Sequence, residues 1–124
     1  MNIRSAFRKR SAGVLVVLFA MVVGVLSGGC STAELSSRGE KVVASPNPPA
    51  ANCVSVKPIV GHGGGTFGGE FISNDDLIEY AFNDLRNQAA EAGANYVQND
   101  PPQLGQGDGT TTTATVSGTA FNCP

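Results

Sequence analysis

One segment of the chain, residues 73–97, has a hydrophobic pattern that identifies its secondary structure by itself. Its apolar side chains recur at helical spacing and fall within an arc of roughly 140° around a helix. They are Leu77, Ile78, Ala81, Phe82, Leu85, Ala89 and Ala92. Ser73 or Asn74 can cap the first backbone amides, and Gly93 supplies a left-handed stop. The pattern therefore predicts an amphipathic helix with one face in the core.

Segments with the composition of β-strands lie on both sides of this helix. Residues 53–60 alternate apolar and polar side chains, and Pro58 favours a sheet edge or a bulge. Residues 95–97 predict a short strand, and residues 110–123 predict a final strand with threonines on a solvated face. Residues 40–45 could add a short edge strand. Because a helix that leads into a strand needs a sheet to cover, we expect an α+β fold, with one helix on a mostly antiparallel sheet of about three to five strands.

Two segments predict loops. Residues 98–109 are polar and contain Pro and Gly, which is typical of a long mobile loop. Residues 61–71 are rich in glycine and predict a flexible loop or hairpin, although backbone amides in such a run can also cup an anion. The run lacks the Lys and Ser/Thr of a phosphate-binding loop. His62 is the one histidine of the chain, and no second histidine can join it, so we expect no metal and no cofactor.

The N-terminus has the three-part pattern of an export signal. Basic residues come first, an uncharged apolar run follows over residues 11–29, and Cys30 comes next. Residues 26–30 resemble the lipobox of bacterial lipoproteins, in which lipid is attached to the cysteine and the signal is removed. Ser27 stands where that motif usually has a large aliphatic residue. An uncleaved membrane-spanning anchor is the alternative, because the run approaches the roughly 20 apolar residues that a bilayer needs.

This pattern divides the chain into three parts. We expect residues 1–29 to be a lipoprotein signal peptide, residues 30–52 to be the lipidated cysteine and a tether, and residues 53–124 to be the folded domain. Without the signal, four Lys and Arg remain against ten acidic residues, a net charge of −6. An acidic domain argues against nucleic acid as a partner and against electrostatic attachment to anionic lipid, so the acyl chains must hold the membrane.

The cysteines fit an oxidising compartment. With Cys30 assigned to lipid, Cys53 and Cys123 remain as a pair. We predict that they form a disulfide, which in the chain-entropy model contributes about 4 kcal/mol for a loop of this length. A redox-active pair is the alternative, but the chain has no CxxC motif to lower a thiol pKa.

Several motifs together resemble a known family. They are AELSSRGEKVV, NCVSVKPIVG, FNDLRNQAAEAGANYV and SGTAFNCP. With the lipobox, they resemble the small enterobacterial-type lipoproteins of unknown function of the YjeI type, over nearly all of the chain after the signal; residues 98–109 depart from that pattern. The helix that leads to a Gly-Ala-Asn strand is more distantly similar to the stress-sensing lipoprotein RcsF, whose second cysteine pair and basic tether this chain lacks. Ser31 resembles the sorting position of outer-membrane lipoproteins.

The polar side of the predicted helix offers the candidate interaction residues. Asp84, Arg86 and Asn87 are turned away from the apolar arc, which favours a solvated face, or a contact with a partner protein that also includes Asn95. Arg86 has no acid three or four residues away, so its partner must lie on another element or on another protein. Gln88 falls inside the apolar arc, where we expect it to bond a backbone group.

The resemblance implies no enzymatic role, and the sequence has no catalytic constellation. We therefore expect a non-enzymatic, lipid-anchored envelope protein that acts as an interaction or envelope-stress module. Its expected place is the outer membrane, with the domain in the periplasm or at the cell surface and envelope proteins as partners. The alternative is a small-ligand or anion binder that uses residues 61–71. The sequence leaves the oligomeric state open.

Overall fold

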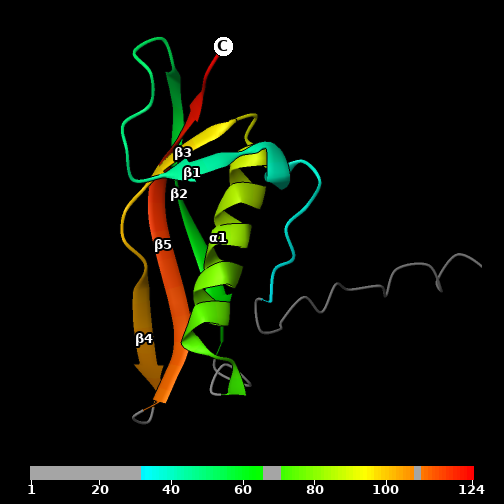
Figure 1. The fold of residues 1–124 in the computed structure, drawn as a ribbon, viewed down its shortest axis with the longest axis vertical. Coiled ribbons are helices and arrows are strands. Elements are labelled where there is room, and N and C mark those ends of the chain that lie inside the picture. The colour runs from blue at the N-terminus through cyan, green and yellow to red at the C-terminus, as the bar shows by residue number, and fades with distance from the viewer. Residues whose placement is uncertain (1–31, 66–70, 108–109) are drawn as a thin grey trace, which may run out of the picture.

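The computed structural model describes residues 32–65, 71–107 and 110–124, so the expected signal peptide and Cys30 lie outside the described residues. Helix α1 lies along one face of a five-stranded sheet (Figure 1). The elements in chain order are the 3-10 turn η1 (Gly39–Lys41), β1 (Val43–Ser45), β2 (Val54–Gly64), α1 (Asn74–Glu91), β3 (Tyr96–Asn99), β4 (Gln103–Gly107) and β5 (Thr110–Asn122). This arrangement confirms the α+β class.

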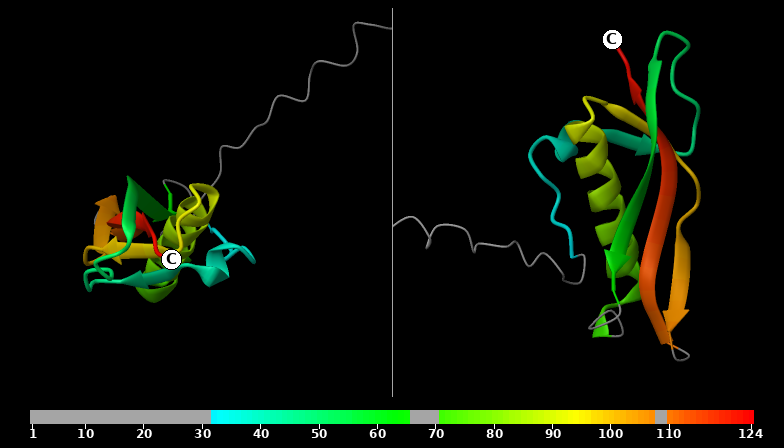
Figure 2. Two further views of the ribbon diagram at one scale, coloured as in Figure 1. Left: turned by 90° about the horizontal axis from the view of Figure 1, so that it is seen from above. Right: turned by 180° about the vertical axis from the view of Figure 1, so that it is seen from behind.

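Strand β5 joins the parts of the sheet. Its 13 residues pair antiparallel with β2 along one edge, and with β4 and then β3 along the other. Strand β1 pairs in parallel with β3, which gives the order β1-β3-β5-β2 with β4 beside β5. Figure 2 shows from behind that β5 runs nearly the whole length of the molecule. The sheet is therefore mostly antiparallel, as the sequence predicts.

The ends of α1 agree with the sequence signals. The Ser73 hydroxyl accepts a hydrogen bond from the backbone N–H of Asp76 at 3.2 Å, which satisfies one of the amides that a helix start leaves unpaired. Gly93 follows the helix with φ +79°, a conformation that glycine adopts without strain. The apolar face packs on the sheet: Leu77, Ala81, Leu85 and Ala89 are fully buried, Ala90 is buried beside them, and Ile78 and Phe82 are partly buried.

The glycine-rich segment differs from the prediction. Gly61–Gly64 are the last residues of strand β2, whereas a flexible loop or hairpin was expected; residues 66–70 lie outside the described residues. A Cβ atom at Gly61 would overlap the carbonyl oxygen of Ala81, and one at Gly63 would overlap that of Leu77. Glycine is needed here because it lets the helix backbone approach the strand closely.

The predicted loop 98–109 also requires a correction, because residues Gln103–Gly107 form strand β4. The long strand β5 extends past β3 and offers backbone groups there, and β4 pairs with them in spite of its glycine and glutamine content. Along β5, half-buried threonines such as Thr113 and Thr115 alternate with the fully buried Ala114 and Val116, as expected for a strand with one solvated face.

The disulfide between Cys53 and Cys123 is confirmed, with their Cα atoms 4.2 Å apart. It joins the start of β2 to the end of β5, next to the bulge at Ser55/Lys57 that the proline-containing edge strand predicts. Strand β1 lies in the sheet and η1 lies against α1. The sequence placed the first residue of the folded domain at Cys53. The folded unit instead begins before Cys53, because β1 pairs with the edge that β3 leaves open.

We expect Gly61→Ala to lower the free energy of unfolding by about 1–3 kcal/mol, because the added methyl group overlaps the helix backbone. Urea unfolding followed by circular dichroism measures the change. Ser55→Ala, at an exposed position of the same strand, is the control and should stay within about 0.5 kcal/mol of the wild type. Equal effects of the two substitutions would show that the helix does not approach the strand as closely as described.

Candidate functional site: the polar face of the helix and the N-terminal strap

The chain before β1 is held along the polar face of α1. We call residues 32–42 the strap (Figure 1). Its first contact is made by Asn83, whose side-chain amide donates to the carbonyl oxygen of Ala33 at 3.0 Å. One helix turn further on, Asn87 binds the strap again. A segment that was expected to be part of a tether is therefore bound to the domain.

Asn87 makes three hydrogen bonds to the strap. Its Nδ2 donates to the carbonyl oxygen of Glu34 at 2.8 Å, and its Oδ1 accepts from the backbone N–H and the hydroxyl of Ser36, both at 2.9 Å. Gly39 is buried beside this amide, and a Cβ atom there would overlap Asn87 Oδ1. Asn87 is thus a structural contact between two segments 51 to 53 residues apart.

Two arginines bind the C-terminal part of the strap and the helix end. Arg86 donates from Nε to the carbonyl oxygen of Val42 at 2.9 Å and from Nη2 to that of Glu40 at 3.0 Å. Arg38 donates from Nη2 to the carbonyl oxygen of Ala90 at 2.9 Å, in the last turn of α1, where a cation complements the helix dipole. The partner that Arg86 lacks within the helix is therefore the backbone of another element.

Two further helix residues bind the outer edge of β2. Gln88 Nε2 donates to the carbonyl oxygen of Val60 at 2.8 Å, and Asp84 Oδ2 accepts from the backbone N–H of His62 at 2.8 Å. Gln88 and Asp84 also bond each other at 3.0 Å. These side chains satisfy backbone groups that an edge strand leaves available to other chains. The expected backbone bond of Gln88 is confirmed, whereas the edge-binding role of Asp84 had no sequence signal.

Asn95 lies beyond the helix and binds a different part of the chain. Its Nδ2 donates to the carbonyl oxygen of Cys123 at 2.7 Å, and its Oδ1 accepts from the Cys123 N–H at 2.8 Å. The expected solvated face is therefore corrected: Asp84, Arg86 and Asn87 are half-buried and bond to their own chain. They share one helix, while Asn95 supports the disulfide.

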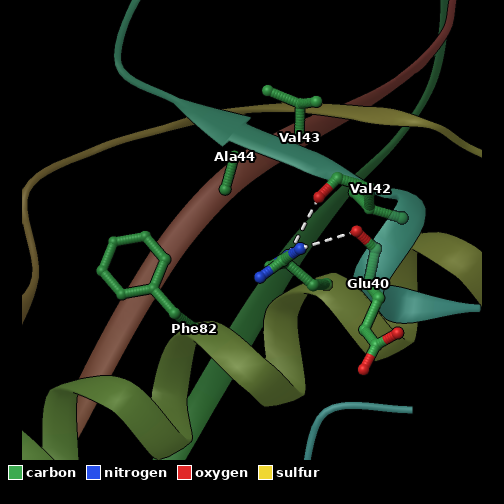
Figure 3. Close-up of a pocket in the computed structure, with 6 residues that line it drawn as sticks. Glu40, Val42, Val43, Ala44 and Phe82 are labelled. Atoms are coloured by element: carbon green, nitrogen blue, oxygen red, sulfur yellow. Dashed lines mark hydrogen bonds between the residues drawn. The ribbon is translucent and has the colours of Figure 1, made fainter. Parts of the chain in front are cut away.

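An open groove of about 450 Å³ lies between the end of the strap, β1 and the helix. It is lined by Glu40, Val42, Val43, Ala44, Phe82 and Arg86. Figure 3 shows Phe82 projecting from the helix on one side, with Ala44 on the strand opposite it and Val43 on the far side of that strand. The surface is mostly apolar, with a guanidinium and a carboxylate at one end. Such a surface suits a peptide or protein contact.

The described half of the glycine-rich segment does not form an amide cup. Gly61–Gly64 pair with Thr113–Val116 of β5, and the Gly65 N–H donates to the carbonyl oxygen of Thr112 at 3.2 Å. The described residues also include no group of three or more His, Cys, Asp or Glu side chains placed to hold a metal. Over the same ranges, no helix has the length and apolar character needed to span a bilayer.

We expect Asn87→Ala to loosen the strap. Loss of the acceptor for the Ser36 N–H should accelerate hydrogen exchange at that amide roughly tenfold, the equivalent of about 1.4 kcal/mol. Exchange measured by NMR tests this. Asn74→Ala, at an exposed position of the same helix, is the control and should leave Ser36 protected. If Ser36 keeps its protection in Asn87→Ala, the bond to Asn87 does not hold the strap.

Comparison with known proteins matches the part of the chain that includes the strap and the sheet. A family described as a domain of unknown function, DUF4156, matches residues 33–123. The match begins at Ala33, the first strap residue that is bonded to α1, and ends at Cys123, the second cysteine of the disulfide. Similar proteins are "Uncharacterized protein YjeI" of Escherichia coli (strain K12) and the protein of the same name from Shigella flexneri. Each is 31% identical over 114 residues, which is 88% of this chain and 97% of the relative. The chain therefore belongs to the DUF4156 family.

Proposed function

We propose that this protein is a non-enzymatic, lipid-anchored protein of the bacterial cell envelope that presents its α/β domain for contact with another envelope protein. The proposed anchor is Cys30, and the proposed location is the outer membrane, with the domain in the periplasm or at the cell surface. A part in sensing envelope stress is a narrower form of the same proposal, based on the likeness to the stress-sensing lipoprotein.

The observation that carries this proposal is the pairing of the cysteines. Cys53 and Cys123 are bonded to each other, which suits an oxidising compartment outside the cytoplasm. Cys30 is then the remaining cysteine, and it directly follows an apolar run with a basic start. Acylation of Cys30 would therefore leave both cysteines of the disulfide bonded to each other.

The polar face of α1 supports a non-enzymatic role. Asp84, Arg86 and Asn87 are the residues from which a reactive site would be assembled there, yet each bonds backbone groups of its own chain. Their arrangement accounts for stability without any substrate. The groove between β1 and the helix, in contrast, leaves apolar surface open to solvent at the half-buried Ala44 and Phe82. This groove is the surface that we assign to the partner.

Maturation at Cys30 is tested by intact-mass analysis of the protein purified from membranes. We expect a product that lacks residues 1–29, carries acyl chains on Cys30 and has no free thiols. Cys30→Ala should retain residues 1–29 and carry no acyl chains, because it cannot be acylated. A wild-type product that still begins at residue 1, or that has free thiols at Cys53 and Cys123, would contradict the proposed anchor.

The groove is tested by photo-crosslinking in cells. A benzophenone amino acid in place of Phe82 lies in the groove, and the same group in place of Phe121, a half-buried aromatic on β5, is the control. We expect one dominant envelope protein to be captured from the Phe82 position, at least fivefold more strongly than from the Phe121 position. Capture of the same proteins from both positions would contradict a specific contact at the groove.

A further inference from the structure

The strap has a direction relative to the helix. Ala33 is bonded by Asn83, Ser36 by Asn87, and Arg38 reaches Ala90. Successive strap residues therefore lie further toward the C-terminus of α1. The first of these contacts, at Ala33, lies beside Asn83 near the middle of α1. Figures 1 and 2 agree that the cyan start of the strap lies beside the lower half of α1 and that the C-terminus of the chain lies at the opposite end of the molecule from the start of α1.

The length of chain before the strap limits how far the domain can be from its anchor. Ala33 is three positions after Cys30, and a fully extended chain spans at most about 3.3–3.6 Å per residue, or about 10 Å in all. Without the contacts of the strap, the free chain would extend from Cys30 to β1 at Val43, a reach of about 45 Å. The bonds from the helix thus shorten the reach of the anchor about fourfold.

The end of the molecule nearest to the start of the strap carries an exposed aromatic residue. Phe71 precedes α1 and is 86% exposed, the largest exposed fraction among the large hydrophobic residues that the structure describes. The disulfide lies at the other end, where Asn95, after the helix, binds Cys123. Asp75, Asp76 and Glu79 accompany Phe71, so this end is acidic and would be repelled by an anionic surface.

We infer that the strap holds the domain against the bilayer, with the start of α1 and Phe71 toward a zwitterionic lipid surface and the disulfide end away from it. The inference rests on the proposed lipid anchor at Cys30. An aromatic side chain that enters the lipid interface adds apolar burial to that of the acyl chains. In this orientation, a protein partner must itself be at the membrane, because the domain cannot move far from its own anchor.

The orientation is tested by energy transfer from tryptophan to lipid headgroups. The chain contains no tryptophan, so Phe71→Trp and Val54→Trp each introduce a single donor; Val54 is 66% exposed and follows the disulfide cysteine Cys53. The acylated full-length proteins are reconstituted in phosphatidylcholine vesicles that contain dansyl-labelled headgroups. We expect at least threefold more transfer from the Phe71 position than from the Val54 position.

A second variant separates the strap from Phe71 itself. Twenty Gly and Ser residues inserted between Ser31 and Thr32 leave the described fold unchanged and lengthen the free chain. We expect transfer from the Phe71 position to fall to the level of the Val54 position. If the insertion leaves the transfer unchanged, or if the two positions give equal transfer without it, the inferred orientation is overturned. Wild-type protein that carries no acyl group and does not co-float with the vesicles would instead overturn the proposed anchor.

Discussion

Backbone N–H and C=O groups that no strand or helix pairs need another partner, and in this domain side chains of α1 are that partner for two segments. Asp84 and Gln88 bond the outer edge of β2, while Arg86 and Asn87 bond the strap. The polar face of an amphipathic helix is ordinarily solvated. Here it bonds both the strap and the outer edge of β2.

The opposite face of the same helix packs closely against strand β2. Gly61 and Gly63 carry no side chains, so the helix backbone lies against β2, and the small residues Ala81 and Ala89 of this face are fully buried. The helix is consequently held from both sides, by the sheet through apolar burial and by the strap through hydrogen bonds. A domain with so few large apolar side chains gains from both, and from the disulfide that closes its far end.

This architecture separates structure from candidate function. Asp84, Arg86 and Asn87, which the sequence offers to solvent or to a partner, bond within the chain, and the groove beside Phe82 is left as the open apolar surface. The strap forms one wall of that groove through Glu40 and Val42. A lipid anchor at the start of the strap and a contact at its end would therefore be mechanically connected, over a distance set by the hydrogen bonds of the helix.

Much of this protein follows from its sequence alone, because the relevant signals are local. Spacing and residue type within a short window determine the helix, its cap at Ser73 and its end at Gly93. The pairing of the two cysteines after Cys30 follows from counting the cysteines. The tertiary structure alone decided that Gly61–Gly64 form a strand, that residues 103–107 extend the sheet, and which groups the polar helix residues bond. These features depend on backbone partners distant in sequence, 22 to 53 residues away in the case of the helix side chains, and no local pattern encodes which edge or segment the fold brings beside them.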